Sequence, residues 1–205
     1  MIQHHSSEAT LAAYAAGSIP EGLGIVIATH LGQCPACRGA LATLEATGGA
    51  LLDELPPVAL AGDALDRVLA RTGEAPRAVP PVVNPELPAP LDRVSLGRWW
   101  TIGLGTRYRP LRTAGAAWGG LIEVQPGRSL PRHGHAGREL TCVLSGSFAD
   151  GAGEYAAGDL SEPLTDHDQP PVVTGAQPCL CIIASEGMKL RGLLGFAQRL
   201  AGRFA

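Results

Sequence analysis

The stretch "GRSLPRHGHAGRELTCVLSG" (residues 127–146) places two histidines and a glutamate within seven positions. His133 and His135 are two residues apart, so on a β-strand both side chains point to the same face. Glu139 keeps the same parity, and the interior of a barrel can therefore receive all three side chains. Two imidazoles and a carboxylate suit Zn²⁺, Fe²⁺ or Mn²⁺ better than an ion that prefers thiolates. The stretch predicts a metal site in a β-rich domain.

The spacing Gly-x5-His-x-His-x3-Glu-x6-Gly in this stretch resembles the first motif of the cupin family at every position. The resemblance implies a jelly-roll barrel. The second cupin motif is degraded, because "YAAGD" (155–159) keeps its glycine but Ser161 stands where the family has a histidine. His167 is then expected to supply the fourth ligand, and a structural cupin without a metal is the alternative. The expected ligands of this second site are His133, His135, Glu139 and His167.

A different metal chemistry is indicated by "HLGQCPAC" (residues 30–37), which holds His30, Cys34 and Cys37. Offsets of four and three residues bring side chains to one face of a helix, so the three ligands would converge at a helix junction. Two thiolates with imidazoles suit tetrahedral Zn²⁺. A closed site needs a fourth ligand, for which His4 and His5 are the candidates.

This stretch has two alternative interpretations. The Cys-x-x-Cys pair could be a thioredoxin-like redox pair, but the surrounding sequence lacks the βαβ pattern that this requires. The three side chains could also be buried independently of one another. Zinc is the favoured interpretation.

The spacing His-x3-Cys-x2-Cys, with a histidine further upstream, resembles the zinc-binding anti-sigma domain. His30, Cys34 and Cys37 match that motif. By its distance from His30, His5 fits the upstream ligand best, and His4 is the fallback. The resemblance implies a first site formed by His5, His30, Cys34 and Cys37.

Residues 1–74 are expected to be helical. Ser6 or Ser7 is a plausible N-cap for a first helix that ends near Gly17. "SIPE" (18–21) has the pattern of a capping box for a second helix that runs to about His30. A third helix should begin at Cys34–Pro35, with Gly48–Gly49 as a weak point. A fourth, "GDALDRVLART", presents Leu65, Val68 and Leu69 on one face.

The amino-acid composition changes after residue 74. Residues 75–92 contain six prolines and predict an extended linker. Residues 93–205 hold short apolar runs separated by glycines, which are typical of an all-β sandwich or barrel. These runs are "RWWTIGL", "AAWGGLIEVQ", "ELTCVLSGSF", "PPVVTG" and "CLCIIAS". The tail "KLRGLLGFAQRLAGRF" (189–204) predicts a basic amphipathic helix. The expected fold class is α+β with two domains, a small all-α zinc domain (1–74) and an all-β cupin domain (93–205).

Charge and hydropathy exclude several function classes. The formal charge is −3, yet residues 1–74 carry eight acidic residues and three arginines, a formal −5. An acidic first lobe argues against direct nucleic-acid binding and suits a basic protein partner, although a merely solvated acidic face is the alternative. No run of about 18 apolar residues predicts a membrane span. No signal peptide is recognisable, so we expect a cytoplasmic protein.

An N-terminal zinc anti-sigma domain followed by a cupin domain resembles the ChrR-type anti-sigma factors over nearly the whole chain. The resemblance implies a cytoplasmic repressor that sequesters an extracytoplasmic-function (ECF) sigma factor through its helical domain. It also implies release under singlet oxygen or organic hydroperoxide stress through the cupin domain. A cupin metalloenzyme of the dioxygenase kind is the rival hypothesis. A DNA-binding cupin regulator is disfavoured because no recognition helix stands out.

Overall fold

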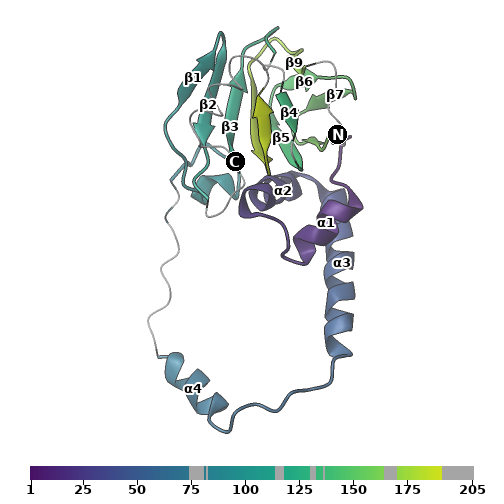
Figure 1. The fold of residues 1–205 in the computed structure, drawn as a ribbon, viewed down its shortest axis with the longest axis vertical. Helices are drawn as coiled ribbons and strands as arrows, with labels where there is room; N and C mark the ends of the chain where they lie inside the picture. The colour runs from purple at the N-terminus through teal and green to yellow at the C-terminus, as the bar shows by residue number, and fades with distance from the viewer. Residues whose placement is uncertain are drawn as a thin grey trace.

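The computed structural model has helices at its N-terminus and antiparallel β-sheets after them (Figure 1). It describes residues 1–73, 81, 83–113, 118–129, 133–135, 137–163 and 170–190. The helices are α1 (Glu8–Ala15), α2 (Glu21–Gln33), α3 (Pro35–Asp53) and α4 (Ala64–Arg71), followed by a short 3-10 helix at Leu91–Arg93. The helices expected in residues 1–74 are therefore confirmed.

Side-chain caps mark the start of α1 and of α3, whereas α2 and α4 have none. Ser7 is the N-cap of α1, and its side chain accepts a hydrogen bond from the Thr10 N–H. The helix stops before Gly17, whose φ of +65° suits a residue without a Cβ. The capping box expected at residues 18–21 is wrong. Pro20 occupies the N-cap of α2, and the Ser18 hydroxyl instead donates to the Ala13 carbonyl. Gly48 and Gly49 do not interrupt α3.

Eleven strands form the β part of the described chain. They are β1 (Trp100–Gly103), β2 (Thr106–Pro110), β3 (Trp118–Val124), β4 (His133–His135), β5 (Glu139–Ser145), β6 (Ser147–Ala149), β7 (Glu154–Ala156), β8 (Leu160–Ser161), β9 (Val172–Val173), β10 (Cys179–Ser185) and β11 (Met188–Leu190). One sheet has the order β1-β2-β3-β10-β5-β8, a second β7-β6-β9, and a third pairs β11 with β4. This arrangement confirms the expected all-β cupin part of the fold.

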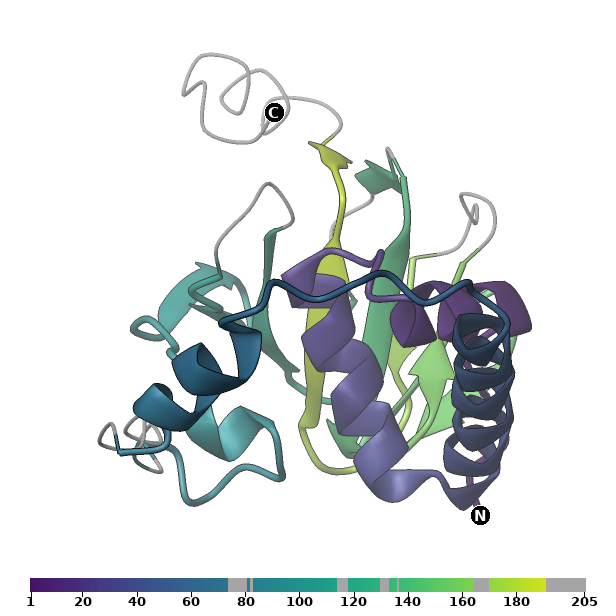
Figure 2. The same ribbon diagram turned by 90° about the horizontal axis from the view of Figure 1, so that it is seen from below.

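The central strands β3, β10 and β5 of the six-stranded sheet are buried on both faces, while the edge strand β1 is exposed. One face packs on the β7-β6-β9 sheet through residues such as Val143, Phe148 and Ile183. The other face packs on α2, where Ile27 lies in one apolar cluster with Leu140 and Ile182. Figures 1 and 2 show α2 lying across this sheet, with α3 extending away from it. Burial on both faces explains why "CLCIIAS" in β10 is apolar at nearly every position.

One expectation about the chain path needs revision, and a second lies almost entirely outside the described residues. The shared parity of His133, His135 and Glu139 implies that residues 133–139 form a single strand. Instead the chain forms β4, which pairs with β11, and then β5, which pairs with β10 and β8. Gly137, at a φ of +109°, lies between the two strands, so parity does not carry over from His135 to Glu139. The C-terminal helix expected at 189–204 lies outside the described residues except for Lys189 and Leu190, which belong to β11.

Part of the proline-rich stretch 75–92 is integrated into the core. Leu91 is fully buried in the cluster that joins α2 to the six-stranded sheet, and Leu87 packs against that cluster. The Asn84 side-chain amide donates to the carbonyls of Leu91 and Val94, which fixes the turn between them. Residues 74–80 and 82 lie outside the described residues. The second half of this stretch therefore packs with both α2 and the sheet.

Because α2 and the six-stranded sheet share one apolar cluster, a cavity created in α2 should also lower the stability of the sheet. Replacing the fully buried Ile27 with alanine should lower the free energy of unfolding by about 2–5 kcal/mol. The protein's tryptophans, Trp99, Trp100 and Trp118, all lie in the β part, so their fluorescence in a urea titration reports the sheet. We expect the fluorescence midpoint to fall. The control Val68→Ala, on exposed α4, should stay within about 0.5 kcal/mol. An unchanged fluorescence midpoint for Ile27→Ala would contradict the shared core.

Candidate metal centre

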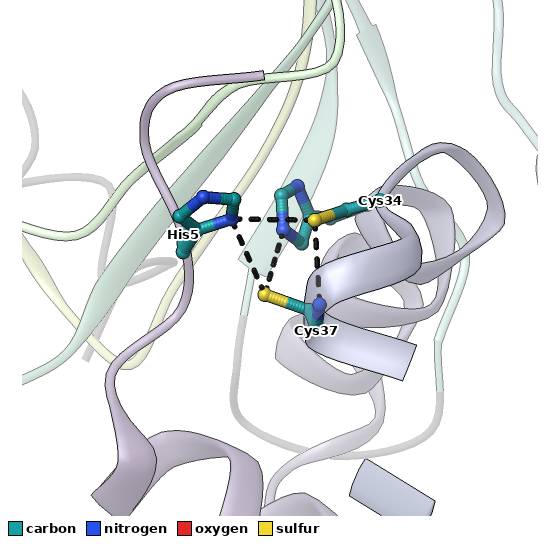
Figure 3. Close-up of side chains that lie close together, drawn as sticks. His5, Cys34 and Cys37 are labelled. Atoms are coloured by element: carbon teal, nitrogen blue, oxygen red, sulfur yellow. Dashed lines mark hydrogen bonds between the residues drawn. The ribbon is translucent and has the colours of Figure 1, made fainter. Parts of the chain in front are cut away.

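Four potential ligands meet where α2 ends and α3 begins. His5 comes from the segment before α1, His30 from the last turn of α2, Cys34 from the junction and Cys37 from the first turn of α3. Their ligand atoms all lie within 4.8 Å of one another. Figure 3 shows His5, Cys34 and Cys37 pointing toward a common centre. The structure thus brings together all four residues expected for the first site.

The distances match those of a tetrahedral thiolate and imidazole site. His5 Nδ1 lies 3.2 Å from Cys34 Sγ and 3.6 Å from Cys37 Sγ, and His30 Nε2 lies 3.3 Å from Cys37 Sγ. Ligands held at zinc bond lengths of 2.0–2.3 Å in a tetrahedron lie about 3.3–3.8 Å apart. Two sulfurs and two imidazole nitrogens are also the donor set that zinc prefers. The residues present therefore fit a zinc ion.

The helix junction itself orients the cysteines. The Cys34 backbone N–H still bonds to the His30 carbonyl at 2.8 Å, so α2 continues to this point. Cys34 then turns extended and caps α3, and its sulfur accepts from the Cys37 N–H at 3.4 Å. Pro35 occupies the first turn of α3, where no backbone donor is needed. This sharp junction places both sulfurs on the side that faces His5.

A single ring nitrogen of His30 remains free for a metal. The ring is fully buried, and its Nδ1 lies 2.8 Å from the Gly158 carbonyl oxygen in the turn between β7 and β8. A carbonyl can only accept, so Nδ1 must carry the proton and Nε2 keeps a lone pair toward the cysteines. Burial lowers the pKa of His30, which favours the neutral ring that a metal needs. Burial raises the pKa of the Cys37 thiol, so an ion must displace its proton on binding.

The segment that carries His5 is tied to the β part. The Asp159 carboxylate accepts from the backbone N–H groups of Gln3 and His4, and Glu162 accepts from both the backbone and the hydroxyl of Ser7. Burial alone would raise the pKa of Asp159, but bonds from backbone donors lower it. The sequence did not identify Asp159 or Glu162 as residues that bind the N-terminal segment. Asp159 was visible in "YAAGD", yet only the fold shows that it reaches the N-terminus.

His4 is held away from the cluster. Its ring stacks near Tyr155 with centroids 4.2 Å apart, and its Nε2 lies 3.0 Å from the Glu154 carbonyl oxygen. Consecutive residues of an extended segment point to opposite sides, so His4 faces β7 while His5 faces the cysteines. Of the two candidates left open by the sequence, His5 has the geometry of the fourth ligand.

The second expected site is only partly described. Glu139 is buried at the start of β5. His133 and His135 lie in β4, but their side-chain positions are not among those the structure describes, and His167 lies outside the described residues. The cupin metal site therefore stays a prediction. Cys179 and Cys181 share a face of β10, and their sulfurs lie 3.6 Å apart. Buried Cys142, on β5, packs on the other face of the same sheet.

Comparisons with known proteins agree with this geometry. The family described as the ChrR cupin-like domain matches residues 93–187. The anti-sigma-E factor ChrR of Cereibacter sphaeroides is 38% identical over 192 residues, which cover 90% of both chains. The chain belongs to the ChrR anti-sigma factor family. A crystal structure of Rhodobacter sphaeroides SigE in complex with the anti-sigma ChrR contains a chain of the same fold. It matches with 38% identity and a TM-score of 0.77 over 90% of this chain and 99% of that chain.

Membership of the ChrR family covers both the helical and the β part, because the aligned share extends well beyond the cupin-like domain. Among the described residues, no helix is both long and apolar enough to span a membrane.

We predict that metal binding at the cluster depends on His5 and not on His4. His5→Ala should remove one ligand and strongly weaken the binding of Co²⁺, which serves as a visible probe of zinc sites. His4→Ala should leave the affinity close to that of the unmodified protein, because His4 faces Tyr155. The thiolate-to-cobalt absorption during a titration reports this cluster specifically. Equal weakening in both variants would contradict the assignment.

Proposed function

We propose that this ChrR-family protein is an anti-sigma factor whose helical part, closed by a zinc ion, sequesters an ECF sigma factor. The observation that carries the proposal is the match of nearly the whole chain to ChrR as seen in complex with SigE. The proposed zinc ligands are His5, His30, Cys34 and Cys37. In so small a helical unit, the free energy of metal binding contributes directly to folding.

The partner surface that we propose lies on the end of α3, on α4 and on the connection between them. Apolar side chains are exposed along this stretch, namely Leu51, Leu52, Leu55, Val58, Leu60, Leu65, Val68 and Leu69. An eight-residue helix such as α4 is marginal without a surface to pack on, and α4 has no buried residue. Figure 1 shows α4 lying apart from the sheets. Exposed large apolar side chains gathered along one stretch of chain in this way are typical of a protein interface.

The negative charge of residues 1–74 indicates which kind of partner this surface binds. Asp53, Glu54, Asp63 and Asp66 lie among these apolar residues, within a lobe of formal charge −5. Sigma factors present basic surfaces to DNA and apolar surfaces to the polymerase, so an acidic and apolar lobe is complementary to them. Direct binding of nucleic acid by this lobe is disfavoured. The sigma factor, and no nucleic acid or membrane, is therefore the proposed partner.

We further propose the division of labour that the sequence suggested. Residues 1–74 carry the sigma-binding surface, 75–92 connect the two parts and pack in part with the core, and 93–205 form the sensory cupin domain. In this proposal the cupin domain holds Zn²⁺, Fe²⁺ or Mn²⁺ with His133, His135, Glu139 and His167. Singlet oxygen or organic hydroperoxides alter that site and bias the chain toward release of the sigma factor in the cytoplasm.

The rival hypothesis is a cupin metalloenzyme, for which no convergent substrate-binding residues were found in the sequence. It also gives the His/Cys cluster and the exposed α4 face no role. Steady-state turnover of small thiols or hydroperoxides by the full chain would favour this rival. Stoichiometric binding of the sigma factor without turnover favours the anti-sigma function.

Loss of the first metal site should abolish sigma binding. Cys34→Ser or His30→Ala removes a ligand, and the variant chain should no longer co-purify with a co-expressed ECF sigma factor. Leu69→Asp tests the surface separately. It should keep the metal and still lose the partner, because a charge is placed in an apolar interface. Wild-type affinity in Cys34→Ser would show that the metal does not organise the interface.

Loss of a cupin ligand should leave sigma binding intact and blunt the response to oxidants. His133→Ala or Glu139→Ala complexes should form normally, because the proposed interface lies on α3 and α4. On exposure to singlet oxygen or an organic hydroperoxide, the unmodified complex should dissociate while these complexes persist. Size-exclusion chromatography before and after exposure measures this. Dissociation of the variants at the normal rate would exclude the cupin metal from the signal.

A further inference from the structure

We infer that the turn joining β7 to β8 (residues 157–159, here the β7–β8 turn) forms the outer shell of the first metal site. The inference rests on the proposed zinc site and adds that the β part of the chain sets its affinity. Ligands of a metal are commonly oriented by hydrogen-bond partners that do not touch the ion. In this chain those partners come from residues more than a hundred positions away.

Gly158 supplies the first of these partners. Its carbonyl oxygen accepts the Nδ1–H of His30 at 2.8 Å, which fixes both the tautomer and the ring orientation. Gly158 has a φ of +93°, a conformation that side-chain-bearing residues rarely adopt. A Cβ at this position would also lie 2.8 Å from carbon atoms of Ile2. A glycine is therefore required for the turn to approach both His30 and the N-terminal segment.

Asp159 supplies the second partner, through the segment that carries His5. It is 3% exposed, and its Oδ1 accepts from the Gln3 N–H at 2.7 Å and from the His4 N–H at 3.1 Å. Its Oδ2 accepts from the Ala156 N–H at 2.9 Å, which fixes the carboxylate within its own turn. The Leu160 N–H donates to the His4 carbonyl at 3.1 Å. Both backbone groups of His4 are thus held, and His5 follows directly.

Two of the four ligands therefore owe their positions to one turn of the β part. His30 is oriented by the Gly158 carbonyl, and His5 is held near the cysteines by Asp159. Without Asp159 the segment that carries the exposed His5 would lose two of the hydrogen bonds that hold it, and metal binding would have to restore part of its order. By thermodynamic reciprocity, a bound ion also stabilises the β7–β8 turn. Asp159 is a positioning residue, since it acts through His5.

The test is a Co²⁺ titration of the metal-free, reduced full-length protein. Asp159→Ala should weaken Co²⁺ binding by about 10- to 100-fold, the range found when outer-shell partners are removed. Asp159→Asn, which keeps one acceptor oxygen, should fall between this variant and the unmodified protein. At saturation the thiolate-to-cobalt band should regain its normal shape, because all four ligands remain. That recovery separates a positioning role from a damaged fold.

A matched control uses another aspartate of the β part. Asp150 accepts from the N–H groups of Ala152 and Gly153 within its own turn, at 2.8 and 3.2 Å. Asp150→Ala should leave Co²⁺ affinity unchanged. Equal affinity of Asp159→Ala and the unmodified protein would overturn the inference and leave the metal site standing. Absence of a thiolate-to-cobalt band in the unmodified protein would instead refute the proposed metal site.

Discussion

The convergence of His5, His30, Cys34 and Cys37 is the constraint on which the N-terminal half depends. Two sulfurs and two imidazole nitrogens lie within 4.8 Å of one another, and three of the four side chains are buried. Packing alone gives little reason to place such groups together, since buried polar groups are costly without strong partners. In our proposal a tetrahedral zinc ion supplies those partners and joins the N-terminal segment to α2 and α3. The ion would then fix how α3 leaves the β part, and α3 leads to the exposed face of α4.

Much of this arrangement could be predicted from the sequence because short-range rules govern it. The spacing of His30, Cys34 and Cys37 predicts a helix junction. The structure has this junction between α2 and α3 at Cys34. The helices before residue 74 follow from their apolar residues and, for α1, from the Ser7 cap. The upstream ligand could not be chosen between His4 and His5 by spacing alone. The structure decides between them, because His5 lies beside both cysteine sulfurs while the His4 ring packs against Tyr155.

The long-range contacts were not predictable in the same way. Residues 30 and 158 are connected by a hydrogen bond that no local pattern encodes, and Asp159 could be seen only as part of a degraded cupin motif. The expectation that Glu139 continues the strand of His133 and His135 was wrong, because Gly137 separates β4 from β5. The proline-rich stretch was expected to be only a linker, but Leu91 has an apolar cluster to fill. In each case the observed structure depends on tertiary contacts that a local sequence pattern does not encode.

The helical part and the β part are therefore coupled physically, by an apolar cluster and by hydrogen bonds around the metal site. This coupling gives a change in the β part a direct route to the surface that we propose for the sigma factor. The central claim is that zinc is bound by two thiolates and two imidazoles at that boundary.

Zinc-edge X-ray absorption on a His133→Ala, His135→Ala protein, loaded with one zinc ion per chain, tests this claim most directly. The account predicts two sulfur ligands at about 2.3 Å and two nitrogen ligands at about 2.0–2.1 Å. A shell of nitrogen and oxygen ligands without sulfur would contradict it.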